Sequence, residues 1–231
     1  MFWALTGTSF GPQIWEEPMK RFGYGQGLAA AAIVLSFAVA GRAQDEGVKK
    51  VEVLAKKAGA TVEAIANTKV QLLKTMDVYN GLMADGATDR KGAYKKLQSE
   101  METTEKRRAE IGLKADEMKA EADTLFKSWA DSAAAISDAG LRKQSDDRLA
   151  KTKASFAEVN TTAQKAAALY GPVMKALQDQ VTYLGHDLNP SAVASLKPNA
   201  AKLNDQAKEL TKRIDDTISS ANTAISALRP Q

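Results

Sequence analysis

The sequence predicts an all-α protein, a long antiparallel four-helix bundle with coiled-coil-like helices. Three observations lead to this prediction. Apolar residues recur every three or four positions over runs of roughly 30 to 48 residues, which is the period of a helix with one buried face. Ala, Leu, Lys and Glu, which lose little side-chain freedom in a helix, are abundant, and only 6% of residues are aromatic. Short breaks separate the runs, so neighbouring helices are expected to be antiparallel.

The first predicted helix carries an apolar seam that stops before residues 85–89. Gly86 can adopt the positive φ that favours a helix stop, and Thr88 or Asp89 can cap the next helix. Thr68 lies at the expected spacing between Ile65 and Leu72, where the seam has no apolar residue. The seam residues are Val51, Leu54, Ala58, Val62, Ile65, Leu72, Met76, Tyr79 and Met83.

The second and third predicted helices meet at residues 137–140. The third contains Pro172, and a kink is expected there because a proline removes one backbone hydrogen bond inside a helix. The second seam comprises Tyr94, Leu97, Met101, Thr104, Arg108, Ile111, Ala115, Met118, Ala122, Leu125, Trp129 and Ile136. The third comprises Leu141, Leu149, Thr152, Phe156, Val159, Ala163, Ala166, Tyr170, Val173, Leu177, Val181, Leu184 and Leu188.

The last predicted reversal lies within residues 185–199, with room for one short helical piece. Pro190 directly follows Asn189, and a proline after a capping residue indicates a helix start. The final seam consists of Leu203, Ala207, Leu210, Ile214, Ile218, Ala221, Ile225 and Leu228.

The N-terminus contains the features of an export signal. Residues 28–40 form an uncharged apolar run, too short to span a bilayer but long enough for a signal-peptide core, and Lys20 and Arg21 precede it. We interpret residues 19–43 as a signal peptide and residues 44–231 as a single helical domain in the periplasm. Residues 1–18 fit an upstream extension before a true start at Met19, and the alternative is that they belong to a long N-terminal region of the signal peptide. An uncleaved inner-membrane anchor is the other interpretation of residues 28–40.

The composition leaves few groups for catalysis or metal binding. The 231 residues include no cysteine and one histidine, His186, and the net charge of +4 comes from basic and acidic residues that interleave. A zinc site needs three or four ligands, and adjacent carboxylates such as Asp215 and Asp216 point about 100° apart on a helix. We therefore expect no enzyme activity, no cofactor or metal, no nucleic-acid partner, and membrane contact only through the signal segment.

Two regions are candidates for interactions. One is the turn near residues 183–189, and the other is Trp129. Together with Tyr183 and Tyr170, Trp129 could line a pocket inside the bundle. Aromatic residues at seam spacing more often belong to the core. The candidate interaction or turn residues are Tyr183, His186, Asp187, Asn189 and Trp129.

The second half of the chain resembles a family of exported bacterial proteins, domain of unknown function 2959. The most specific part is the segment DQVTYLGHDLNPSAVASL, which is similar to the family's DQVLYLKHNLN; Gly185, Asp187 and Pro190 depart from that pattern. The resemblance also rests on the pairs Leu125-Phe126 and Leu141-Arg142. It implies an exported helical protein and no particular activity.

These observations predict a non-enzymatic scaffold or interaction protein of the bacterial cell envelope. Its partner is expected to be another envelope protein or a second copy of the chain. The alternative hypothesis is a helical binding module for a small apolar or amphipathic ligand, held between the helices near Trp129 and Tyr183.

Overall fold

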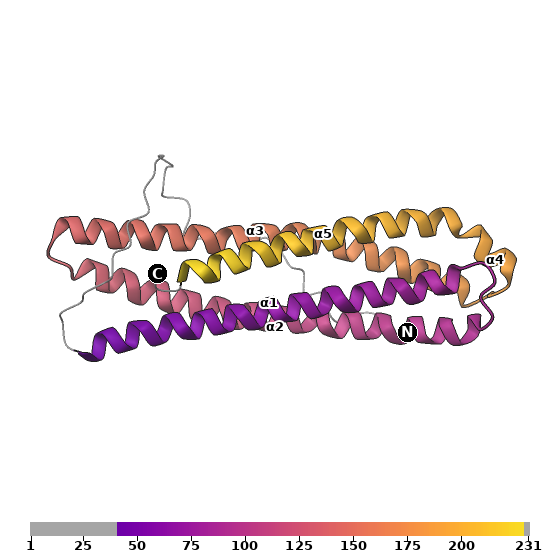
Figure 1. Ribbon diagram of the computed structural model, residues 1–231, viewed down its shortest axis with the longest axis horizontal. Coiled ribbons are helices and arrows are strands. Elements are labelled where there is room, and N and C mark those ends of the chain that lie inside the picture. Colours follow the sequence, from indigo (N-terminus) through magenta and orange to yellow (C-terminus); the bar gives the residue numbers. More distant parts are fainter. Residues whose placement is uncertain (1–40, 229–231) are drawn as a thin grey trace, which may run out of the picture.

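The computed structural model describes residues 41–228, which fold into five helices (Figure 1). The helices are α1 (Gly41–Met83), α2 (Arg90–Ala134), α3 (Ala139–Leu184), α4 (Pro190–Ser195) and α5 (Lys197–Leu228). The all-α class is confirmed, because residues 41–228 contain no strand. The predicted upstream extension and signal peptide lie outside the described residues, except for residues 41–43, which form the first turn of α1.

The four long helices run side by side along the long axis of the molecule, and the short α4 lies at one end (Figure 1). Helix α1 packs against α2 and α5, and α3 packs against α5 and α2. The α1–α2 connection and α4 lie at one end of the molecule, and the α2–α3 connection lies at the other end (Figure 1).

The predicted turns form where capping residues and glycine favour them. Gly86 has a φ of 79°, and the Asp89 carboxylate accepts a hydrogen bond from the backbone N–H of Gly92 at 2.8 Å. Asp138 caps α3 in the same way, through the backbone N–H of Leu141 at 2.8 Å. Each carboxylate satisfies a backbone donor that the first turn of a helix leaves without a partner.

The reversal before α5 follows the prediction, with two differences in its bounds. The Asn189 side chain accepts from the N–H of Ala192 at 2.8 Å, and Pro190 is the first residue of α4. Helix α3 ends at Leu184, so Leu188 lies beyond it, and α5 already begins at Lys197. Pro198 is tolerated because the first turn of a helix needs no N–H donor. Helix α3 continues through Pro172.

The predicted seams supply most of the buried side chains, which form two apolar clusters. The larger cluster lies toward the α4 end and contains Leu72, Tyr79 and Leu177, while the smaller one contains Leu54 and Phe156. Leu82 is also fully buried, although the predicted seam does not include it. Several seam residues, such as Val62 and Ile111, are only half-buried.

On three helices, a buried threonine lies between the two clusters. Thr61 on α1, Thr162 on α3 and Thr217 on α5 each separate residues of the larger cluster from residues of the smaller one along their helix. Each hydroxyl donates to the carbonyl four residues earlier, and the Thr61 hydroxyl also lies 3.0 Å from the carbonyl oxygen of Lys114 on α2. The protein therefore has two apolar cores with a polar layer between them.

Replacing Leu177 with Asp tests the assignment of the larger core. The leucine side chain has no exposed surface, so the new carboxylate would be buried without a partner, at a cost of several kcal/mol of unfolding free energy. Urea denaturation followed by circular dichroism measures the loss. Leu113→Asp is the matched control, because Leu113 is 66% exposed, and its effect should stay within about 0.5 kcal/mol. Equal stabilities of the two variants would show that the core is wrongly assigned.

Candidate functional site

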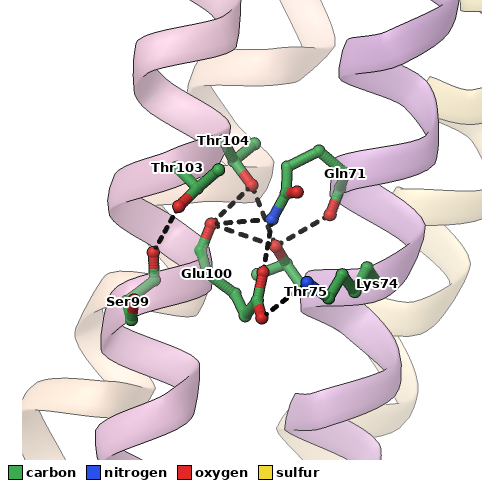
Figure 2. A network of polar contacts seen from close by, with 7 residues as sticks. All are labelled: Gln71, Lys74, Thr75, Ser99, Glu100, Thr103 and Thr104. Atoms are coloured by element: carbon green, nitrogen blue, oxygen red, sulfur yellow. Dashed lines mark hydrogen bonds and ion pairs between the residues drawn. The ribbon is translucent and has the colours of Figure 1, made fainter.

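The most buried group of polar side chains in the described residues lies between α1 and α2 (Figure 2). Gln71 on α1 donates a hydrogen bond to a carboxylate oxygen of Glu100 on α2, with Nε2 2.7 Å from Oε2. The same amide nitrogen is 3.3 Å from the backbone carbonyl oxygen of Glu100. One side chain of α1 thus contacts both the side chain and the backbone of α2.

Two threonines continue this contact by one turn. The hydroxyl oxygens of Thr75 on α1 and Thr104 on α2 are 2.8 Å apart, and neither side chain is exposed. Each hydroxyl also lies 2.9 Å from the carbonyl oxygen four residues earlier in its own helix. Because each hydroxyl has a single proton, one threonine donates to the other, and the second donates to its local carbonyl while it accepts from the first.

Glu100 is held as a carboxylate in this network. Hydrogen bonds from the Gln71 amide and from the Lys74 ammonium group lower the pKa of Glu100 against the opposing effect of its burial. Lys74 Nζ lies 2.9 Å from Oε1 of Glu100, whose side chain is 11% exposed. An ionised carboxylate with donors on both oxygens is a poor proton donor. Its chemical role here is to accept hydrogen bonds that join α1 to α2.

A second buried polar contact joins α1 to α3. The hydroxyl of Tyr79 donates a short hydrogen bond to the side-chain carbonyl oxygen of Gln180, and both side chains are buried. Burial raises the pKa of Tyr79 well above its usual range, so the phenol keeps its proton at physiological pH. Helix α1 is therefore bonded through buried side chains to two of the other long helices.

Four of the residues predicted as interaction sites cluster at the α3–α4 connection. The exposed Tyr183 hydroxyl is 3.2 Å from that of Ser195, and the backbone N–H of His186 donates to the carbonyl of Tyr183. The Asp187 carboxylate accepts from the backbone and the side chain of Asn189, at 2.9 and 2.7 Å. These contacts close the turn and start α4, so local hydrogen bonds account for the conformation of this segment.

Trp129 lies far from this turn. Its indole N–H donates to the Ser145 hydroxyl at 3.0 Å, and the Arg148 guanidinium lies 5.7 Å from the ring centroid. Ser145 and Tyr183 are both on α3, separated by 38 residues, or about 57 Å of helix at 1.5 Å per residue. Trp129 on α2 thus lies beside the start of α3, whereas Tyr183 lies at the far end of α3, so the two side chains do not line one pocket.

The buried contacts between α1 and α2 were missed in the sequence. The predicted seams include Thr104 but not Gln71, Thr75 or Glu100, since polar residues beside a seam usually face water. The available signal is their spacing. Thr68, Gln71 and Thr75 follow each other at three and four residues, and so do Leu97, Glu100 and Thr104.

Residues 41–228 contain no cluster of three His, Asp or Glu side chains suited to a metal ion. Across the same residues, the helices lack a stretch with the length and apolar character needed to cross a membrane.

Together, the long helices and the buried hydrogen bonds between them define an all-helical protein whose buried polar side chains join its helices. The chain belongs to the family described as protein of unknown function (DUF2959), whose sequence profile matches residues 41–228. No curated protein and no solved structure matches the chain.

Replacing Glu100 with Gln should destabilise the protein in a pH-dependent way. Because the folded-state pKa lies below the ordinary value of 4.5, the contribution of Glu100 is fully present above that pH. It is lost as the pH falls through the folded-state pKa. We expect a loss of about 1.5–3 kcal/mol at pH 7 in urea denaturation, and a smaller difference from the wild type near pH 3.

The control for this variant is Glu102→Gln. Glu102 is exposed on the same helix and pairs with Lys106, so its loss should change the stability little at either pH. A Glu100→Gln protein as stable as the Glu102→Gln protein at pH 7 would contradict the proposed role of the α1–α2 contact.

Replacing Tyr79 with Phe removes the buried hydroxyl and leaves the Gln180 carbonyl without its donor. We expect the unfolding free energy to fall by about 1–3 kcal/mol. Tyr183→Phe is the control, because that hydroxyl is bonded at the surface and its loss should stay within about 0.5 kcal/mol. Thermal denaturation of both variants distinguishes the two cases, and equal melting temperatures would argue against the α1–α3 bond.

Proposed function

We propose that this protein is a non-enzymatic scaffold or interaction protein of the bacterial cell envelope, with its four long helices arranged as an antiparallel bundle. The observation that carries the proposal is how the buried polar groups are used. Gln71, Glu100, Tyr79 and Gln180 all form side-chain bonds between helices. Such contacts favour one fixed alignment of the helices, which is what a protein needs to present a constant surface to a partner.

The shape of the molecule supports the same proposal. Helices α1, α2 and α3 have 43, 45 and 46 residues, or about 65 to 70 Å of helix at 1.5 Å per residue. A rod of this length has a large surface for its mass, and it can contact partners at positions far apart along its axis. The aligned helices keep those positions at fixed distances from one another.

Location in the periplasm is part of the proposal and is supported by the sequence before α1. Residues 28–40 have the length and composition of a signal-peptide core, and basic residues precede them. Export would leave a mature chain beginning near Gln44, within the first turns of α1.

Fractionation and crosslinking in the native host test the proposal. We expect the mature protein in the periplasmic fraction, with an intact mass that places its first residue near Gln44. A photoreactive amino acid at exposed positions along the rod should give the same crosslinked partners in repeated experiments. Uniform absence of crosslinks from all positions would count against an interaction role, and an uncleaved membrane-bound species would make residues 28–40 an anchor instead.

A further inference from the structure

The seam between α2 and α3 is only half-buried in the middle of the rod. Within α2, all of which the structure describes, no side chain is buried between Thr104 and Met118, which are 14 positions apart, or about 21 Å. Within α3, likewise described throughout, none is buried between Thr162 and Val173. Both helices thus leave the same part of their common seam close to solvent.

The other two long helices are well buried at this level. The Thr61 hydroxyl lies 3.0 Å from the carbonyl oxygen of Lys114, which places the threonine layer beside this part of α2. At the layer, α1 buries Ile65, and α5 buries Ile214 and Thr217. The interior is therefore closed on the side of α1 and α5 and thinly covered on the side of α2 and α3.

Small side chains make up much of this thin cover. Gly112 and Ala115 on α2 and Ala163 and Ala166 on α3 are half-buried. Because hydrophobic stabilisation is roughly proportional to the apolar area removed from water, such residues stabilise the seam less than the leucines of the two cores do. Separating α2 from α3 here therefore costs less than separating them elsewhere.

A polar contact around Tyr170 bridges the two helices in this stretch. The Tyr170 hydroxyl lies 3.2 Å from the carboxylate of Glu105, and the Arg108 guanidinium lies 5.6 Å from the centroid of the tyrosine ring. Arg108 occupies a position of the predicted seam, where a charged group is stable only if it reaches water or a polar partner. The contact thus stands at the boundary between the interior and solvent.

The backbone of α3 is weakened at one end of the same stretch. Pro172 has no N–H, so the carbonyl of Ala168, four residues earlier, lacks the hydrogen bond that a helix normally provides. Prolines inside helices are the commonest sites of bending. Residues 163–172 can therefore move with less loss of backbone hydrogen bonding than the rest of α3.

Strong contacts hold the helices on both sides of this stretch. Toward α4, the buried bond between Tyr79 and Gln180 ties α3 to α1. Toward the α2–α3 connection, the rings of Phe126 and Phe156 pack edge to face with their centroids 5.7 Å apart. The weak part of the seam thus lies between two anchors.

We propose that this part of the seam is a gate, formed by residues 105–117 of α2 and residues 163–172 of α3. In the open state, α3 bends away from α2 between the anchors, and small molecules reach the threonine layer of an otherwise folded protein. Helix α3 is the one that moves, because the contacts of Gln71 and Thr61 hold α2 on α1. The inference goes beyond the proposed scaffold function and does not rest on it.

Labelling of a single introduced thiol tests the gate, because the chain contains no cysteine. Thr217→Cys places the thiol in the threonine layer, and Thr152→Cys is the matched control in the smaller core. The two threonines are 2% and 4% exposed, and each hydroxyl donates to the carbonyl four residues earlier at 2.9 Å. We expect iodoacetamide to label Thr217→Cys at least about tenfold faster than Thr152→Cys in native buffer.

The dependence of labelling on urea shows whether it requires unfolding. Global unfolding exposes most of the buried surface and is strongly promoted by urea, whereas a local opening exposes little. From 0 to about 1 M urea, labelling of Thr217→Cys should rise less than about twofold, and that of Thr152→Cys at least about fivefold. Thr61→Cys on α1 is a second probe of the layer and should behave like Thr217→Cys, since Thr61 is 5% exposed.

Removing the bridging tyrosine should open the gate further. Tyr170→Ala should raise the labelling rate of Thr217→Cys several-fold more than that of Thr152→Cys, because only the first depends on the contact between Tyr170 and α2. Trp129→Ala is the control, since Trp129 contacts α3 near the α2–α3 connection, and it should not favour Thr217→Cys. Circular dichroism of each variant checks that the helices are intact.

Three results would overturn the proposal. Equal rates and equal urea dependence at the two thiols would mean that the layer is reached only by unfolding. A Thr217→Cys thiol that reacts as fast as one in unfolded protein would mean that the layer is permanently open. A Tyr170→Ala variant that speeds both thiols equally would mean that Tyr170 contributes only to overall stability. Partner crosslinking and cell fractionation are independent of these rates, so the gate and the proposed function can fail separately.

Discussion

The alignment of α1 with α2 is the constraint on which the rest of the structure depends. Apolar seams with small residues distinguish poorly between neighbouring alignments, because a shift by one heptad again places apolar residues against each other. The contact of Gln71 with Glu100 removes this freedom. A shifted α1 would leave the Glu100 carboxylate buried without its donor, which costs several kcal/mol. With α1 fixed against α2, the Tyr79–Gln180 bond fixes α3, and α5 fills the remaining side.

The sequence was sufficient to predict the helices because their seams and caps are local signals. The spacing of Leu54, Leu72 and Leu97 identifies faces that must be buried, and Asp89 and Asn189 stand where a helix can begin. Leu82 was missed because it belongs to a second column beside the main seam. Burial there depends on how many neighbours a helix has, and a single periodic stripe does not contain that information.

The site was harder to predict because its residues acquire their role only through a partner helix. Gln71 and Glu100 are 29 positions apart and are polar, so each by itself resembles a surface residue. The pocket hypothesis for Trp129 and Tyr183 rests on residue type alone and takes no account of their separation along the bundle. An antiparallel hairpin places Trp129 beside the start of α3, and counting residues from there would have put Tyr183 at the far end.

The threonine layer between the two apolar cores has a consequence for the dynamics of the molecule. Cooperative opening extends as far as continuous apolar packing does, and a polar layer with few large side chains is a natural boundary between such units. The larger core, with the α1–α2 contact inside it, forms one unit, and the smaller core near the α2–α3 connection forms the other. Amide hydrogens on the two sides of Thr61, Thr162 and Thr217 are then expected to exchange through separate opening events. One half of the rod is thus expected to open locally while the other keeps its helices in place.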